Sequence, residues 1–118
     1  MAKAKYTGPA DKLELYESLV ASVDGVERKG AANPYTSRNG HMTSFIDREG
    51  EISIRLATDD REEFMETYDS RISVQYGSEM KEFVVIPDAL LEDLEAARQW
   101  FIRGWEWVGS LDPKPTKR

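Results

Sequence analysis

The chain of 118 residues contains no cysteine. This absence excludes a disulfide scaffold, a zinc or iron–sulfur site built from thiolates, and a cysteine nucleophile. Long hydrophobic runs are also missing, since no stretch approaches the ~20 apolar residues that a membrane span requires. The N-terminus has lysines but lacks the apolar segment of a signal peptide. We therefore expect no membrane association and a cytoplasmic location.

Motifs for catalysis and phosphate binding are missing as well. The chain has no Gly-x-Gly-x-x-Gly, no phosphate-binding Gly-Lys-Ser/Thr loop, no Gly-x-Ser-x-Gly and no calcium loop. The single histidine, His41, has no neighbour in sequence that would orient it as a base. The acidic pairs Asp59-Asp60 and Glu62-Glu63 suit the start of a helix, where carboxylates offset the helix dipole. We expect no enzymatic activity, no metal and no cofactor.

The net charge of −6 is unevenly distributed along the chain. Five of the 16 basic residues lie in the two tails: Lys3, Lys5, Lys114, Lys117 and Arg118. Residues 6–113 therefore hold 11 basic residues against 22 acidic ones. An acidic body repels phosphate backbones, so we do not expect nucleic-acid binding. Weak nucleic-acid contact through the basic tails is kept as an alternative.

The length suits a single domain, since domains typically hold ~100–150 residues. We assign residues 1–8 to a flexible tail, residues 9–111 to the domain, and residues 112–118 to a basic tail rich in proline and lysine. Neither an internal repeat nor a domain linker is evident in the sequence.

Periodicity predicts the elements of the first half. Pro9 and a helical spacing of apolar residues predict a helix over Ala10–Val23. Val26–Ala32 is ambiguous between an edge strand and a loop. Alternating side chains predict a hairpin of His41–Ile46 and Glu51–Leu56. Thr58 is a plausible N-cap for a second helix, which ends near Asp69.

The second half adds a hairpin and a long helix. Strands are predicted over Arg71–Tyr76 and Met80–Ile86, with Gly77-Ser78 as the turn between them. Asp88 then caps a last helix, roughly Ala89–Gly109. Strands grouped as hairpins between helices predict a two-layer α+β fold. Its antiparallel sheet would have four to five strands, with the helices on one face.

The segment Asn33–Met42 is long, polar and rich in turn-forming residues, and Asn39-Gly40 favours a tight turn. Loops of this length in a small domain are often functional. The segment has two interpretations, as a ligand-binding loop or as a cover over the sheet that is plugged by Tyr35. The candidate ligand or partner residues here are Tyr35, Thr36, Ser37, Asn39 and His41. Together with Arg55, they would form the site of a small-ligand binder or enzyme.

Two tryptophans of the last helix form a second candidate surface. Trp100 and Trp107 are seven residues apart and lie about 100° around the helix from the main apolar stripe. This second face is either buried, which widens the packed arc of the helix, or it meets a partner. Tryptophan is common in cores and at interface hot spots, so both interpretations stay open.

The chain also resembles a known family. The resemblance rests on Arg28-Lys29-Gly30, Pro34-Tyr35-Thr36-Ser37, Asn39-Gly40-His41-Met42, Ile54-Arg55-Leu56, Val85-Ile86-Pro87 and the closing Leu111-Asp112-Pro113-Lys114-Pro115. In order and spacing, these motifs resemble the N-terminal domain of the TfoX/Sxy family over residues 10–116. The resemblance implies an antiparallel two-layer fold similar to secretion chaperones, and it allows a dimer. The resemblance implies a link to competence only for the full-length members of the family, which carry a second, C-terminal domain. The resemblance supplies no active-site residue.

The leading hypothesis is a non-enzymatic protein-interaction module that binds a protein partner or a second copy of itself. Its surface would be the sheet face near Asn33–Met42 or the face of Trp100 and Trp107. One alternative is an accessory protein linked to transcription or competence that contacts nucleic acid through its tails. The other is the small-ligand binder or enzyme described above.

Overall fold

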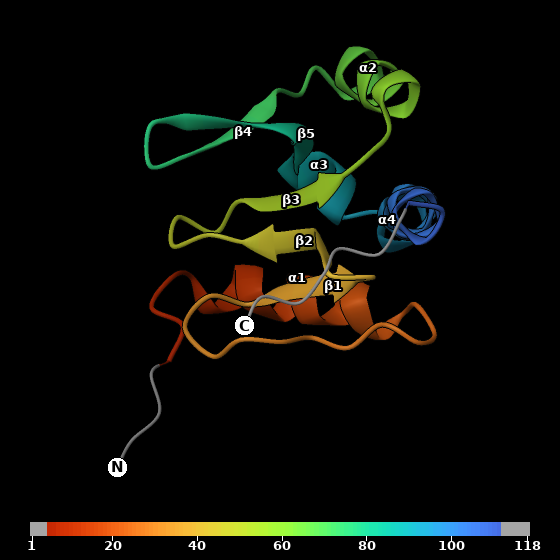
Figure 1. The fold of residues 1–118 in the computed structure, drawn as a ribbon. Coiled ribbons are helices and arrows are strands. Elements are labelled where there is room, and N and C mark those ends of the chain that lie inside the picture. Colours follow the sequence, from red (N-terminus) through yellow and green to blue (C-terminus); the bar gives the residue numbers. More distant parts are fainter. Residues whose placement is uncertain (1–4, 112–118) are drawn as a thin grey trace.

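A computed structural model describes residues 5–111 of the chain. It contains one antiparallel five-stranded sheet with four helices (Figure 1), which confirms the predicted two-layer α+β fold. The strands lie in the order β1-β2-β3-β5-β4. The elements, in chain order, are α1 (Ala10–Ala21), β1 (Tyr35–Arg38), β2 (His41–Ile46), β3 (Ile52–Arg55), α2 (Thr58–Tyr68), β4 (Ile72–Gln75), β5 (Ser78–Ile86), α3 (Asp88–Leu91) and α4 (Leu94–Gly109).

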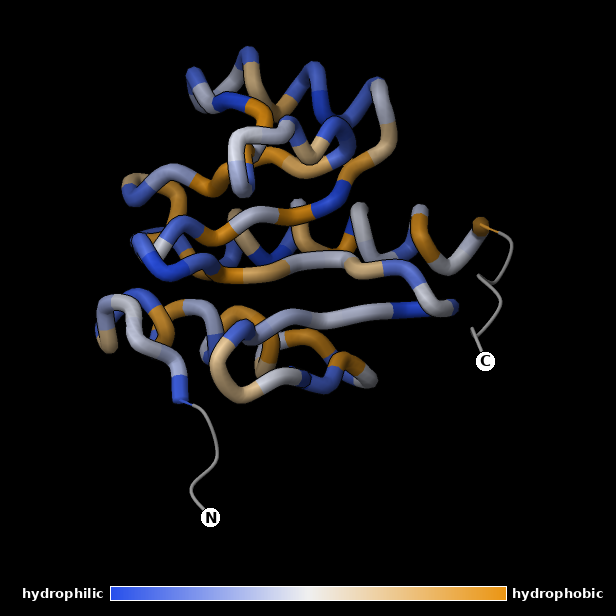
Figure 2. Tube along the Cα trace, turned by 60° about the vertical axis from the view of Figure 1, so that its left-hand side comes forward, coloured by the Kyte–Doolittle hydropathy of each residue, from blue (hydrophilic) through white to orange (hydrophobic). Residues whose placement is uncertain are grey.

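The hydrophobic core lies between the sheet and the helices. The sheet contributes alternate residues of its inner strands, such as Ile52, Ile54 and Val84, which are almost completely buried. Tyr16 of α1 and Phe64 of α2 are likewise buried in this core. Hydrophobic residues recur between hydrophilic ones along the strands and helices in Figure 2, as expected where each element buries one side.

Helix α4 approaches the sheet very closely at one point. Gly104 faces the end of β3, and a side chain there would overlap the carbonyl oxygen of Arg55. The same helix contacts β1 and β2. Glycine is therefore required at this position for space, since the approach brings the helix against the backbone of the sheet.

Several predicted boundaries are wrong in detail. The last helix is two helices, because Asp93 leaves helical geometry and its carboxylate accepts a hydrogen bond from the Ala96 amide as the N-cap of α4. Thr58 and Asp88 are the first residues of their helices and not N-caps. The turn between β4 and β5 lies one residue earlier than predicted, at Tyr76-Gly77.

The segment Asn33–Met42, expected to be a loop, is mostly a hairpin. Residues 35–38 form edge strand β1, which pairs with β2. Asn39 and Gly40 form the two-residue turn with φ angles of 55° and 79°. Positive φ at both positions is the geometry that Asn-Gly favours in tight hairpins. The ambiguous segment before it contributes only an isolated bridge between Lys29 and Tyr35.

Most of the predicted tails lie outside the described residues, so Lys3, Lys114, Lys117 and Arg118 are not placed. Within residues 5–111, no helix has both the length and the hydrophobicity needed to cross a membrane.

Candidate functional site

Thr36, one of the candidate residues, belongs to a buried hydroxyl cluster. Its hydroxyl is hydrogen-bonded to Thr43 at 2.6 Å and to Ser44 at 2.5 Å, and Ser44 is bonded to the Tyr16 hydroxyl at 2.7 Å. All four side chains are buried. Burial raises the pKa of Tyr16 to about 12, against the opposing effect of these hydrogen bonds and of the nearby Arg28 charge. The cluster anchors the first hairpin to α1 and presents no reactive group at the surface.

The turn of the same hairpin binds the end of α4. The Asn39 side-chain amide donates hydrogen bonds to the Val108 and Gly109 carbonyl oxygens at 3.5 and 3.3 Å. Arg38 donates to the Trp105 carbonyl oxygen at 2.9 Å, and its guanidinium lies 5.1 Å from the Trp105 ring centroid. Because α4 has no basic residue in its last turn, Arg38 supplies the positive charge that stabilises a helix C-terminus.

Ser37 and Arg55 are also engaged in contacts within the chain. Ser37 accepts a hydrogen bond from the Lys29 ammonium group at 2.9 Å. Arg55 pairs with Glu82 at 2.6 Å, donates to the Met42 carbonyl oxygen and lies over the Phe83 ring. His41 lies partly buried at the start of β2, opposite Arg38. Arg55 thus lies beside the residue that follows His41, and the small-ligand site stays a prediction.

The two tryptophans have different surroundings. Trp100 is only 7% exposed. Its ring packs edge-on against Phe64 and Tyr68, and its indole nitrogen donates to the Tyr68 hydroxyl at 3.0 Å. Wide burial of the helix thus accounts for Trp100. Trp107 is partly exposed and is the one of the two that stays available to a partner.

The sheet face opposite the core has its own apolar cluster. Phe45, Phe83 and Val85 are buried but do not belong to the core between sheet and helices. The rings of Phe45 and Phe83 lie 5.4 Å apart. Ser53 pairs with Phe45 and Val85 on the neighbouring strands, and its buried hydroxyl has no hydrogen-bond partner within residues 5–111. This side of the sheet, which faces the viewer in Figure 1 with α1 and α3 behind it, is called the open face below.

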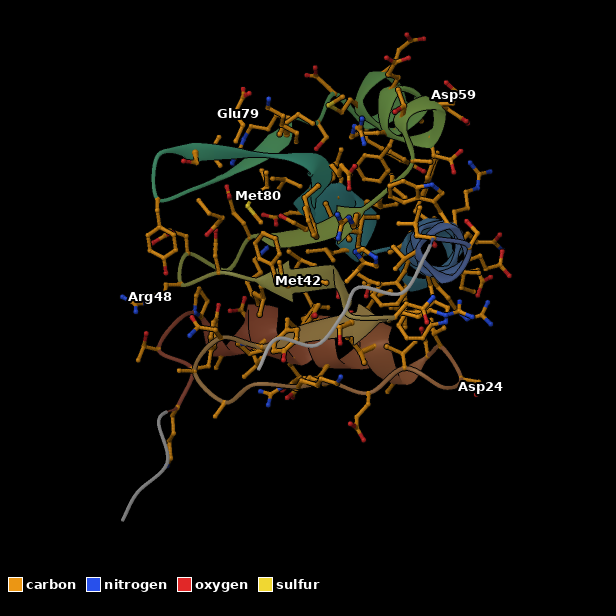
Figure 3. All side chains as sticks on the ribbon, viewed as in Figure 1. Asp24, Met42, Arg48, Asp59, Glu79 and Met80 are labelled. Carbon is orange, nitrogen blue, oxygen red and sulfur yellow. The ribbon has the colours of Figure 1, made fainter. Side chains whose placement is uncertain are left out.

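A groove of about 580 Å³ lies on the open face. Its walls are the segment 33–35, the turn 47–49 after β2, and the hairpin of β4 and β5, and its apolar lining includes Tyr35, Met42, Phe45 and Met80. Met42 and Met80 lie on the viewer's side of the sheet in Figure 3. Methionine packs adaptably against varied surfaces, and pockets of this size accept a drug-sized ligand. Of the predicted residues, Tyr35 alone lines the groove.

The hairpin at the groove's rim carries the most exposed aromatic residue. Tyr76 is 94% exposed, and the nearby Val74 is 47% exposed. Tyr76 also has a φ of 53°, a left-handed conformation that is costly for bulky side chains and that turns usually assign to Asn, Asp or Gly. Tyr76 therefore combines a strained backbone conformation with a side chain that gains almost no packing within residues 5–111.

Sequence reasoning missed this rim, although the signal was present. A two-residue turn of Tyr-Gly between alternating strands departs from the preferred Asn-Gly, and placing the turn at Gly77-Ser78 concealed the departure. The groove itself carries no such signal, because its lining comes from three separate segments between residues 33 and 80.

Comparison of the chain with protein-family models, with curated proteins and with solved structures gave no match. The resemblance to the TfoX/Sxy N-terminal domain and to secretion chaperones therefore stays a prediction. Residues 5–111 contain no group of three or more His, Cys, Asp or Glu side chains that could hold a metal ion.

Proposed function

We propose that the chain is a non-enzymatic protein-interaction module that binds its partner on the open face. The observation that carries this proposal is the groove of about 580 Å³ on a sheet face that no helix of residues 5–111 covers. Concave sites with a mostly apolar lining and a few polar groups are the usual places where proteins bind other molecules. The methionine and aromatic lining suits protein side chains, since these residue types are enriched at interfaces.

The placement of the other candidates supports the same function. Thr36, Asn39 and Arg55 are held by contacts within the fold and do not converge on a substrate-sized space. Enzymes that use a protein nucleophile need it, a base and an orienting group within hydrogen-bond reach of one another. The groove instead offers an apolar floor with a polar rim, which is the anatomy of a protein-binding patch.

Position-specific photo-crosslinking in cells tests the proposal. A photoreactive phenylalanine analogue replaces Met80 in the groove, and in a matched variant it replaces Glu62, which is exposed on α2. We expect protein adducts from position 80 and none above background from position 62. Equal adduct yields at the two positions, or none at position 80, would contradict the proposal.

A further inference from the structure

The groove and the exposed hairpin belong to one continuous patch on the open face. Tyr76 and Val74 come from the β4–β5 hairpin, and both also line the groove. The patch therefore contains both an apolar groove and exposed apolar side chains beside it. Such a patch can bind a second copy of itself, because the side chains of each copy can enter the groove of the other. Two-fold symmetric dimers require this property, because the same patch serves both subunits.

Charge is arranged in the same complementary way across the patch. Arg48 lies in the turn after β2 and lines the groove, whereas Glu79 lies on β5 next to Met80. Within residues 5–111 neither side chain forms an ion pair, although most other arginines do. In Figure 3, Arg48 projects outward from its turn, and Glu79 points to the outer side of the hairpin, away from Met80.

We propose that a second copy of this chain occupies the groove, with the exposed Tyr76 side chain at the tip of each β4–β5 hairpin inserted into the groove of the other copy. In such a two-fold pair, the inner sides of the two hairpins meet at the axis. The outer side of each hairpin then lies against the turn 47–49 of the other copy. This arrangement brings Glu79 of one copy to Arg48 of the other, twice in the dimer, and buries Tyr76. The inference rests on the proposed function, because it assigns an occupant to the same face.

The net charge of −6 on each copy opposes association only weakly at physiological salt. The screening length there is about 8 Å, so most charges on the far surfaces of the two copies do not interact. The Arg48–Glu79 contacts are local and of opposite sign. The complementary rim therefore outweighs the overall charge in deciding whether a second copy docks.

Sedimentation velocity of the full chain measures whether it dimerises. Concentrations up to about 1 mM are needed to detect a dimer with a dissociation constant as weak as that value. We expect the mass to rise from 13.5 kDa toward twice that value. The substitution Tyr76→Asn should weaken the dimer about thirtyfold or more, the usual consequence of truncating an interface hot spot. It should also raise the melting temperature of the monomer by about 2–8 °C, because asparagine tolerates the positive φ.

Charge-reversal variants test the proposed contacts between Arg48 of one copy and Glu79 of the other. Arg48→Glu and Glu79→Arg should each weaken self-association roughly tenfold, since each turns two attractive rim pairs into repulsive ones. An equimolar mixture of the two variants should form a heterodimer at least as well as the parent chain, because opposite charges then meet at both contacts. Glu62→Arg on α2 is the matched control and should change nothing.

Three results would overturn the inference. These are a mass of 13.5 kDa at every concentration, a dimer that Tyr76→Asn does not weaken, and charge variants that fail to complement each other in the mixture. Crosslinking from position 80 separates these failures from a failure of the proposed function. A monomeric chain that still forms adducts there with a different protein would retain the open face as an interface and lose only the second copy.

Discussion

The buried Tyr16 hydroxyl should make the stability of this protein depend on pH in the alkaline range. Burial raises the pKa of Tyr16 to about 12, whereas a tyrosine in the unfolded chain titrates near 10. Between these values the unfolded state has released the proton and the folded state has kept it. Stability is therefore fully present below pH 10 and is lost as the pH rises toward 12. Two pKa units correspond to about 3 kcal/mol of unfolding free energy.

The substitution Tyr16→Phe isolates this effect from the titration of other residues. At pH 8 the variant should be about 1 kcal/mol less stable, because the bond to Ser44 is lost while Ser44 keeps its bond to Thr36. At pH 12 the parent has lost about 2 kcal/mol that the variant retains. The variant should then be the more stable of the two by about 1 kcal/mol.

Urea unfolding of both proteins at intervals from pH 8 to pH 12 measures the difference directly. The lysines and the remaining tyrosines titrate alike in the two chains, so their contributions cancel. A difference in unfolding free energy that stays constant across this range would refute the reasoning, since it would mean that Tyr16 titrates normally in the folded protein.

Three further substitutions test the fold and the groove. Gly104→Ala should destabilise the protein by about 1–3 kcal/mol in thermal melts, because the new methyl group meets the Arg55 carbonyl oxygen and outweighs alanine's helix preference of ~1 kcal/mol; a higher melting temperature would contradict the close approach. Asn39→Ala should cost about 1–3 kcal/mol through its positive φ and its lost bonds to α4, and Asn39→Gly should cost less. Met80→Lys should change the unfolding free energy by less than about 1 kcal/mol yet reduce self-association, and unchanged self-association would argue against the groove.

The fold class was predictable because its signals are local. Alternation along β3 and β5 and helical spacing in α1 and α4 each follow from burial of one side. The break between α3 and α4 was missed since the apolar stripe continues through Leu94, which is 39% exposed and contributes little packing. The spacing of the apolar residues alone does not show that α3 ends before Asp93 and that Asp93 is the N-cap of α4.

The role of the polar segment Asn33–Met42 was not predictable, because it depends on distant partners. Thr36 is buried by its contact with the hydroxyl cluster that reaches α1, and Asn39 bonds to α4, about 70 residues away along the chain. A sequence shows that such residues are polar but not what satisfies them. Each interpretation applies to a different part of the segment. Its strand and turn make contacts within the fold, whereas Tyr35 lines the groove.

The surroundings of Trp100 were undecided for the same reason. Helical geometry places Trp100 and Trp107 on one side of α4, but it does not show that α2 covers only the first of them. The unpacked Tyr76 was accessible to sequence reasoning, since its place before Gly77 in a two-residue turn is unusual for a tyrosine.

Pairing of the chain through its open face can be observed in the NMR resonances of its methionine methyl groups. Met42 and Met80 lie in the groove, whereas Met65 lies on α2 and serves as an internal control. On dilution from about 1 mM to about 10 μM, a range that spans weak specific binding, we expect the resonances of Met42 and Met80 to shift and that of Met65 to stay in place. Resonances that do not move with concentration, or a shift confined to Met65, would contradict it.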